Sequence, residues 1–100
     1  MTITAEIVTF RLAPGAEPDI FRQAAVAMQP FLTRTGGFIR RTLSVDEDGL
    51  WTDHILWQSA EDAGRAAQAI MSAPEAAAFM PLIDEASTQM RHAQVSLQQE

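Results

Sequence analysis

The sequence has no cysteine, lysine, tyrosine or asparagine, and each absence removes a class of chemistry. Without cysteine the chain has no disulfide, no thiolate metal ligand and no thiol nucleophile. Without lysine it forms no Schiff base, and without tyrosine or asparagine it lacks a phenolic acid and one common oxyanion donor. The groups left for chemistry are two histidines, carboxylates, arginines, hydroxyl groups and two indoles.

Positive charge and long apolar runs are also scarce. Seven arginines face 13 acidic residues, for a net charge of −6. A nucleic-acid-binding protein needs a basic surface, so we expect no nucleic acid partner. No apolar run approaches the roughly 18 residues of a membrane span, and residues 1–4 do not resemble a secretory signal. We therefore expect a cytoplasmic protein without a membrane partner.

The composition that is present is typical of a folded domain. The chain has 100 residues, of which 47% are hydrophobic and 20% are charged. This length predicts a single domain covering residues 1–100. Such a small domain buries only about two thirds of the surface of its extended chain. An additional buried surface would help, so we expect a homodimer.

The hydrophobic pattern predicts four strands and two helical regions. Apolar residues recur at helical spacing in residues 18–35 and again after Ser59. Pro30 is expected to kink the first helix. Ser59 and Ser72 each precede an acid at capping-box spacing, which predicts two helix starts. Alternating side chains predict strands at residues 3–12, 38–46, 50–58 and 87–97.

The order of these elements predicts the fold. Strand, helix, strand, strand, helix, strand is the order of a ferredoxin-like βαββαβ sandwich, an α+β fold with a four-stranded antiparallel sheet. The acidic turn at residues 46–49 joins the second and third strands as a hairpin, because Gly49 tolerates a positive φ.

The strand at residues 50–58 has two unlike faces. We expect the helices to meet the more apolar set of each strand, and His54 to lie on that side. The other face, turned away from the helices, would then line a cavity or a dimer contact. We expect it to carry Ile7, Thr9, Phe38, Arg40, Thr42, Trp51, Asp53, Ile55, Trp57, Met90 and His92.

Asp53 and His92 are the candidate catalytic residues. Asp53 is flanked by indoles, and a buried carboxylate needs a partner or a raised pKa. It is either paired with Arg40, Arg41 or Arg11 across neighbouring strands, or a base that takes a proton from a phenol or enol. His92 is either an interface histidine or a base near neutral pH. The two histidines are expected on opposite faces, so no metal site is expected.

The candidate substrate-binding residues surround this pair. Trp51 and Trp57 either pack in the core or form a flat wall for an aromatic ligand. Arg40 either pairs with surface acids or binds an anionic group. Whether Glu6, Arg40 or Arg41 faces the cavity stays open at this stage. The expected binding set is Trp51, Trp57, Arg40, Met90 and Phe38.

Three short motifs together resemble the antibiotic biosynthesis monooxygenase-like family of dimeric α/β barrels. They are Pro14-Gly15 after the first strand, residues 37–39 opening the second, and residues 57–63 after the third. The resemblance covers residues 3–97. Asp48-Gly49-x-Trp51-x-Asp53-x-x-x-Trp57 and Met90-x-His92 look like an uncharacterised bacterial subgroup. The resemblance implies two sheets packed face to face in a homodimer, with a ligand cavity and no cofactor.

The resemblance transfers to individual positions only in part. Trp57 matches the indole that ends the third strand in the cofactor-free members, but Asp53 stands where they have asparagine. Ala63 stands where they have tyrosine. In the haem-degrading branch a histidine is expected in the second helical region, where this chain offers Phe79. The haem-degrading activity is therefore not implied.

These observations lead to three hypotheses. The first is a cofactor-independent monooxygenase acting on a small aromatic or polyketide-like compound, with Asp53 or His92 as the base. The second is a non-catalytic homodimeric binding or accessory protein. The third is an isomerase or lyase that uses the same acid and histidine without oxygen. A cavity large enough for a ligand and reached by both groups would favour chemistry.

Overall fold

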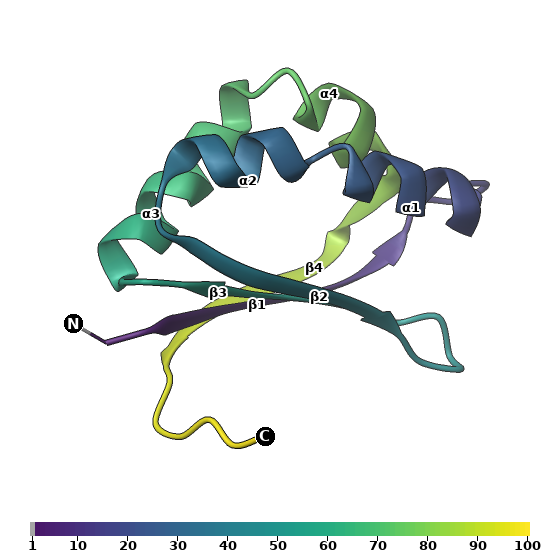
Figure 1. Ribbon diagram of the computed structural model, residues 1–100. Helices are drawn as coiled ribbons and strands as arrows, with labels where there is room; N and C mark the ends of the chain where they lie inside the picture. Colours follow the sequence, from purple (N-terminus) through teal and green to yellow (C-terminus); the bar gives the residue numbers. More distant parts are fainter. Residues whose placement is uncertain (1) are drawn as a thin grey trace.

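The computed structural model describes residues 2–100 as a four-stranded antiparallel sheet with helices on one face (Figure 1). The ferredoxin-like fold predicted from the sequence is confirmed. The strands lie in the order β2-β3-β1-β4, so β1 and β3 form the centre of the sheet. The elements are β1 (Thr4–Leu12), α1 (Pro18–Val26), α2 (Gln29–Thr35), β2 (Phe38–Val45), β3 (Trp51–Trp57), α3 (Ala60–Ala69), η1 (Ile70–Ser72), α4 (Ala76–Phe79), η2 (Met80–Leu82) and β4 (Ile83–Gln94).

The first predicted helix is two helices. α1 ends at Val26 and α2 begins at Gln29, one residue before Pro30. Proline lacks a backbone N–H and its ring clashes with the preceding turn, so a continuous helix is interrupted there. The last strand begins at Ile83 rather than at residue 87.

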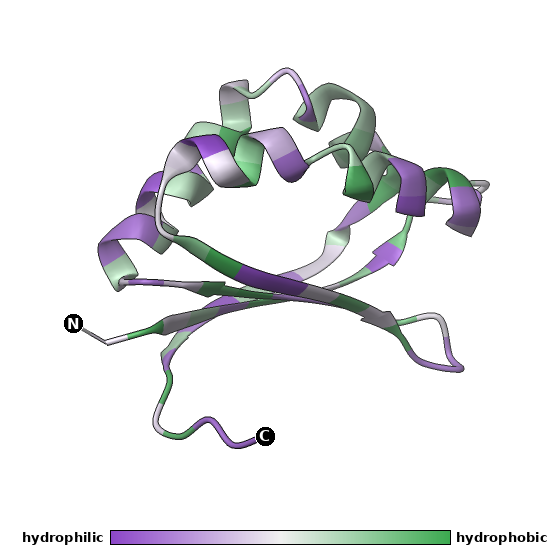
Figure 2. Ribbon diagram, in the orientation of Figure 1, coloured by the Kyte–Doolittle hydropathy of each residue, from purple (hydrophilic) through white to green (hydrophobic). Residues whose placement is uncertain are grey.

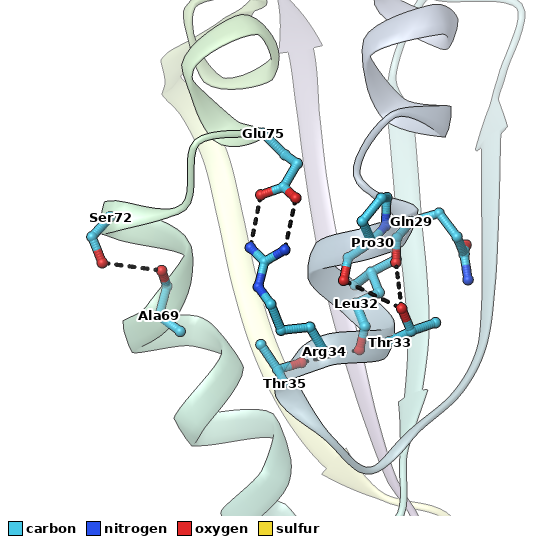
Figure 3. A network of polar contacts seen from close by, with 9 residues as sticks. All are labelled: Gln29, Pro30, Leu32, Thr33, Arg34, Thr35, Ala69, Ser72 and Glu75. Atoms are coloured by element: carbon cyan, nitrogen blue, oxygen red, sulfur yellow. Dashed lines mark hydrogen bonds and ion pairs between the residues drawn. The ribbon is translucent and has the colours of Figure 1, made fainter.

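The second helical region confirms one predicted cap and corrects the other. The backbone N–H of Asp62 donates to Ser59 Oγ at 3.1 Å, so Ser59 caps α3 as expected. The prediction that Ser72 caps a helix is wrong, because the helix that follows, α4, starts after Glu75 without a side-chain cap. Glu75 instead accepts two hydrogen bonds of 2.8 Å from Arg34, which ties α2 to the segment before α4 (Figure 3).

Phe21 joins the helical layer to the sheet and to α4. Its ring centroid lies 4.9 Å from that of Trp51, 5.2 Å from Phe79 and 5.5 Å from Phe10. Two of these contacts are edge-to-face, a geometry that stabilises aromatic pairs beyond their buried area. Apolar and polar segments alternate along the helices, as a layer with one buried side requires (Figure 2).

The predicted orientation of β3 is wrong. The face that carries Trp51, Asp53, Ile55 and Trp57 packs against the helices, and His54 lies on the uncovered face. Both faces of β3 are partly apolar, and the larger indoles gain more from burial under the helices. Met90 and His92 also lie on the helix side, because they pair in register with Val8 and Glu6.

Phe38 and Arg40 lie on opposite faces, contrary to the expectation. A register irregularity between Phe38 and Arg40 breaks the alternation at the start of β2. Phe38 therefore packs against Trp57 on the helix side, with ring centroids 5.9 Å apart. Arg40 pairs with Leu56 and is exposed on the uncovered face.

The uncovered face of the sheet is mixed in character. Ala5, Ile7, Thr9, Arg40, Thr42, Thr52, His54, Leu56, Arg91 and Ala93 alternate with the helix-side residues and share this face. The C-terminal tail runs away from the helical layer on this side (Figure 1). No helix within residues 2–100 is long and apolar enough to cross a membrane.

Candidate functional site

A cleft of about 860 Å³ lies between the sheet and the helical layer. Its floor is the helix-side face of the sheet, to which all four strands contribute, and its roof comes from α2, α3 and the residues that follow α3. The lining is mainly apolar. Its polar and charged members are Glu6, Arg41, Asp53, Ser72, Glu85 and Thr88.

Asp53 is bound by Arg41 from the neighbouring strand. Arg41 Nε donates to Asp53 Oδ1 at 2.8 Å, and Nη2 donates to Oδ2 at 2.7 Å. Both side chains are buried, with exposed fractions of 14% for Arg41 and 7% for Asp53. Of the two alternatives for Asp53, the geometry matches the ion pair. Both of its oxygens are occupied by the guanidinium group.

Arg41 is fixed by two further contacts. Its Nη1 donates to the backbone carbonyl of Ala25 in α1 at 2.8 Å. Its guanidinium carbon lies 5.6 Å from the ring centre of Phe79 in α4, within the range of a cation–π contact. The pair therefore ties β2 and β3 to two helices. No buried polar side-chain atom among the described residues lacks a hydrogen-bond partner.

Glu6 is a buried acid of the cleft that forms no ion pair with an arginine, whereas Glu85, the other acid without such a pair, is exposed. Its side chain is 12% exposed, and Trp57 Nε1 donates to its Oε1 at 3.0 Å. Burial raises the pKa of Glu6 above its ordinary value, an effect that the Trp57 hydrogen bond and the nearby His92 partly oppose. A carboxyl group with a raised pKa in an apolar cleft is suited to accept a proton from a weak acid.

His92 lies beside Glu6 at the edge of the sheet. The two residues are partners across β1 and β4, and His92 Nε2 lies 3.9 Å from Glu6 Oε1. The His92 side chain is 31% exposed and is not part of the cleft lining. His92 therefore reaches the cleft through Glu6.

The structure brings together only part of the predicted site. Asp53, Trp57 and Met90 line the cleft. Trp51 lies in the core beneath α1 and contacts Phe21, as the packing alternative predicted. Phe38 supports Trp57 from outside the lining, and Arg40 is on the other face of the sheet.

Glu6 was not among the predicted site residues, although the sequence holds a signal for it. Glu6 has the same strand parity as Val8 and Phe10, both of which line the cleft. An acid in an apolar set is costly to bury unless it has a role or a partner. Its partner, the Trp57 indole, lies 51 residues away in sequence and becomes evident only in the fold.

The exposed part of the cleft lining is rich in methionine. Met71, Met80 and Met90 are 85%, 47% and 53% exposed, and all three line the cleft. They come from η1, η2 and β4, so the opening lies between the helical layer and the β4 edge. Methionine is flexible and polarizable and adapts to ligands of different shape.

Among the described residues, no cluster of three histidines or carboxylates is arranged to hold a metal ion. His54 and His92 lie on opposite faces of the sheet, as the strand parity predicted.

Comparisons with known proteins identify similar solved structures. SnoaB, a cofactor-independent oxygenase from Streptomyces nogalater, is 19% identical, with a TM-score of 0.66 over 100% of this chain and 97% of its own. A proposed antibiotic biosynthesis monooxygenase from Bordetella bronchiseptica is 18% identical, with a TM-score of 0.80 over 97% and 100%. Another from Caulobacter crescentus is 12% identical, with a TM-score of 0.71 over 96% and 92%.

No protein-family model and no curated protein matches the sequence. The structural matches nevertheless span nearly the whole chain and agree on one architecture. The chain therefore has the fold of the antibiotic biosynthesis monooxygenase-like structures that the sequence motifs resemble.

Proposed function

We propose that this protein is a cofactor-independent monooxygenase that acts on a small aromatic or polyketide-like compound. The observation that carries the proposal is Glu6, a buried carboxyl group with a raised pKa on the floor of an apolar cleft of about 860 Å³. The similarity of the fold to SnoaB, a cofactor-independent oxygenase, supports the same reading. The volume lies within the range of small-molecule sites.

Glu6 acts as the general base in this proposal. The carboxylate removes a proton from a phenol or an activated C–H group of the substrate, and the electron pair of that bond stays on the substrate. The resulting carbanion-like species reacts directly with dioxygen. For oxidation of a CH₂ group to a carbonyl, one oxygen atom enters the substrate, the other leaves as water, and the substrate supplies all four electrons.

Trp57 positions the proposed base. The Trp57 N–H holds Glu6 Oε1, which keeps the carboxyl group oriented. Its ring borders the cleft but is only 1% exposed, so it supports the wall from within the core. Asp53 was a predicted base, but its bidentate contact with Arg41 makes Glu6 the better candidate. A direct catalytic role for Asp53 or His92 stays a prediction.

We also propose that the protein forms a homodimer through the uncovered face of the sheet. The indole-bearing face that the sequence assigned to a cavity or dimer contact is covered by the helices, so the dimer proposal rests on the small size of the domain and on the other face of the sheet. Ile7 and Ala93 lie partly exposed on the uncovered face and supply apolar surface for a second copy, whereas Ala5 and Leu56 on the same face are already buried within one chain. The cytoplasmic location stays a prediction.

The second candidate function is non-catalytic binding of a small molecule. The neutralised Asp53 favours it, because one of the two predicted catalytic groups serves the fold instead. The two candidates differ in their dependence on Glu6. A binding protein needs only the shape and polarity of the Glu6 side chain, whereas the oxygenase needs Glu6 as a base.

Oxygen uptake with a panel of phenols, naphthols and hydroxyquinones tests the proposal. For any compound that is turned over, Glu6→Gln is expected to lower the rate by about 10²–10⁴-fold, the usual contribution of a general base. Glutamine can still accept the Trp57 hydrogen bond, so binding should persist. Glu61→Gln, an exposed change in α3, serves as the control. Unchanged turnover in Glu6→Gln would rule out Glu6 as the base.

A further inference from the structure

A proton accepted by Glu6 needs a route out of the cleft. The Glu6 side chain is 12% exposed and the cleft around it is mainly apolar. A protonated Glu6 cannot act as a base again until it passes its proton on. The groups that face Glu6 therefore decide whether turnover can continue.

The groups inside the cleft do not take up this proton. Asp53 and Arg41 are bound to each other through two hydrogen bonds, and an arginine stays protonated in proteins. The Trp57 indole only donates. The helical layer adds no titratable side chain to the described lining, and Glu85 lies on β4 beyond Thr88.

His92 is the titratable neighbour that links Glu6 to solvent. It is the cross-strand partner of Glu6, with Nε2 at 3.9 Å from Oε1. It stands on β4, an edge strand, and its side chain is 31% exposed. The other histidine, His54, lies on the uncovered face and cannot replace it.

We propose that His92 relays the proton from Glu6 to solvent during the reaction. This inference rests on the proposed function of the cleft. The substrate proton first forms a bond to a Glu6 oxygen. That O–H bond then breaks as neutral His92 accepts the proton at Nε2, and the imidazolium group gives it to water or buffer. Glu6 returns to the carboxylate form, and no electron leaves the substrate in this step.

The distance of 3.9 Å is longer than a direct hydrogen bond. A single bridging water or a small side-chain rotation closes such a gap, and catalytic contacts often shorten when a ligand binds. His92 does not touch the substrate in this arrangement. It acts through Glu6, as a residue that restores the base.

Carbon-13 NMR titration of Glu6 tests the link without any substrate. A protonated imidazole beside the carboxylate favours the charged form of Glu6. His92→Gln is therefore expected to move the Glu6 midpoint to higher pH, whereas the matched change His54→Gln leaves it in place. A Glu6 midpoint that is the same in the wild type and in His92→Gln would overturn the proposal.

Rescue by imidazole tests the relay during turnover. In dilute buffer, His92→Gln is expected to lower kcat about tenfold or more with KM little changed, and added imidazole should restore most of the rate. Glu6→Gln should show no rescue, because the base itself is missing. Wild-type kcat in His92→Gln at low buffer concentration would overturn the relay.

The two measurements separate this inference from the proposed function. If the wild-type protein consumes no oxygen with any compound of the panel, the oxygenase proposal fails. The NMR titration still shows whether Glu6 and His92 interact electrostatically, which the relay requires. A coupled titration together with an absent imidazole rescue would overturn the relay and leave the oxygenase proposal standing.

Discussion

Arg41 and Asp53 show how a single pair of residues can look catalytic in the sequence and structural in the fold. The two are buried and joined by two hydrogen bonds of 2.8 and 2.7 Å. Buried ion pairs contribute little net stability, yet removing one partner leaves an unpaired charge in the interior. Stability and activity measurements on the same variants therefore distinguish the two roles.

Loss of Asp53 is expected to destabilise the protein strongly. Asp53→Ala should lower the free energy of unfolding by about 3–5 kcal/mol, because Arg41 is left buried without its partner. Urea denaturation measures this. The control is Asp19→Ala, which removes an exposed ion pair with Arg22 and should change stability by less than about 1 kcal/mol.

A different result would restore the catalytic interpretation of Asp53. If Asp53→Ala unfolds at nearly the urea concentration of the wild type but loses turnover, Asp53 acts in chemistry rather than in the fold. The double variant Arg41→Met/Asp53→Leu adds a second check. It should be more stable than Asp53→Ala, because no buried charge is left unpaired.

Glu6 gives the stability of the protein a pH dependence of its own. Its folded-state pKa is raised by burial, so the folded protein binds the proton more tightly than the unfolded chain. Stability is therefore highest while Glu6 is protonated and falls as the pH rises from about 4.5 through the raised value. Above that pH the folded state bears the cost of a buried charge.

Glu6→Gln is expected to remove this dependence. Below pH 4 the variant and the wild type should have similar thermal midpoints, because Glu6 is protonated in both states of the wild type. As the pH rises to 8, the midpoint of Glu6→Gln should move above that of the wild type. A difference that stays constant from pH 4 to pH 8 would contradict a raised pKa.

At the scale of secondary structure elements, the roof of the cleft is held by an ion pair between helices. Arg34 of α2 donates two hydrogen bonds of 2.8 Å to Glu75, which immediately precedes α4 (Figure 3). Ala73 and Ala76 on either side of Glu75 line the cleft. The pair therefore helps to fix η1, α4 and η2, the short helical segments between α3 and β4.

This pair is expected to weaken in acid. The hydrogen bonds from Arg34 lower the pKa of Glu75 to about 2. The stability that the Arg34–Glu75 pair adds is therefore complete above pH 4.5 and is lost as the pH falls to 2. Glu75→Gln should unfold at a lower temperature than the wild type at pH 6. That difference should shrink between pH 4.5 and pH 2, whereas Glu61→Gln should behave like the wild type throughout.

An alternative outcome would place the pair outside the stability of the fold. If the wild type and Glu75→Gln have equal thermal midpoints at pH 6, the contact is an exposed pair with no net effect, as many surface ion pairs are. The Arg34 side chain is 51% exposed, whereas that of Glu75 is 17% exposed. The comparison of thermal midpoints at pH 6 decides whether the pair behaves as an exposed ion pair or as a partly buried one.

At the scale of the whole molecule, the helices cover one face of the sheet and leave the other open (Figure 1). The proposed dimer would cover this second face. Sedimentation velocity at micromolar concentration is expected to give twice the mass of one chain. Ile7→Arg should shift the protein to the monomer, because it places a charge at the centre of the shared face.

The control for the dimer is a matched substitution outside the sheet. Val26→Arg changes an exposed residue of α1 in the helical layer, and it should leave the dimer intact. A wild-type protein that sediments as a monomer would contradict the dimer. The cleft lies within one chain, so that result would not affect the Glu6 proposal.

Local sequence signals determined the elements and their order. Residues 46–49 form the predicted turn, in which Asp46 Oδ1 accepts from the N–H groups of Asp48 and Leu50. Ser59 caps α3 as its spacing predicted. Turns, caps and hydrophobic periods depend on neighbours a few residues apart, so they can be interpreted without the fold.

Tertiary structure decided which face of each strand meets the helices. Alternation defines two faces, but in β3 both are partly apolar, so parity alone cannot choose between them. The choice came from Phe21, whose contact with Trp51 joins residues 30 positions apart, and from the irregularity after Phe38. The pairing of Asp53 with Arg41 and the placement of Glu6 depend on the same long-range packing, which no local pattern records.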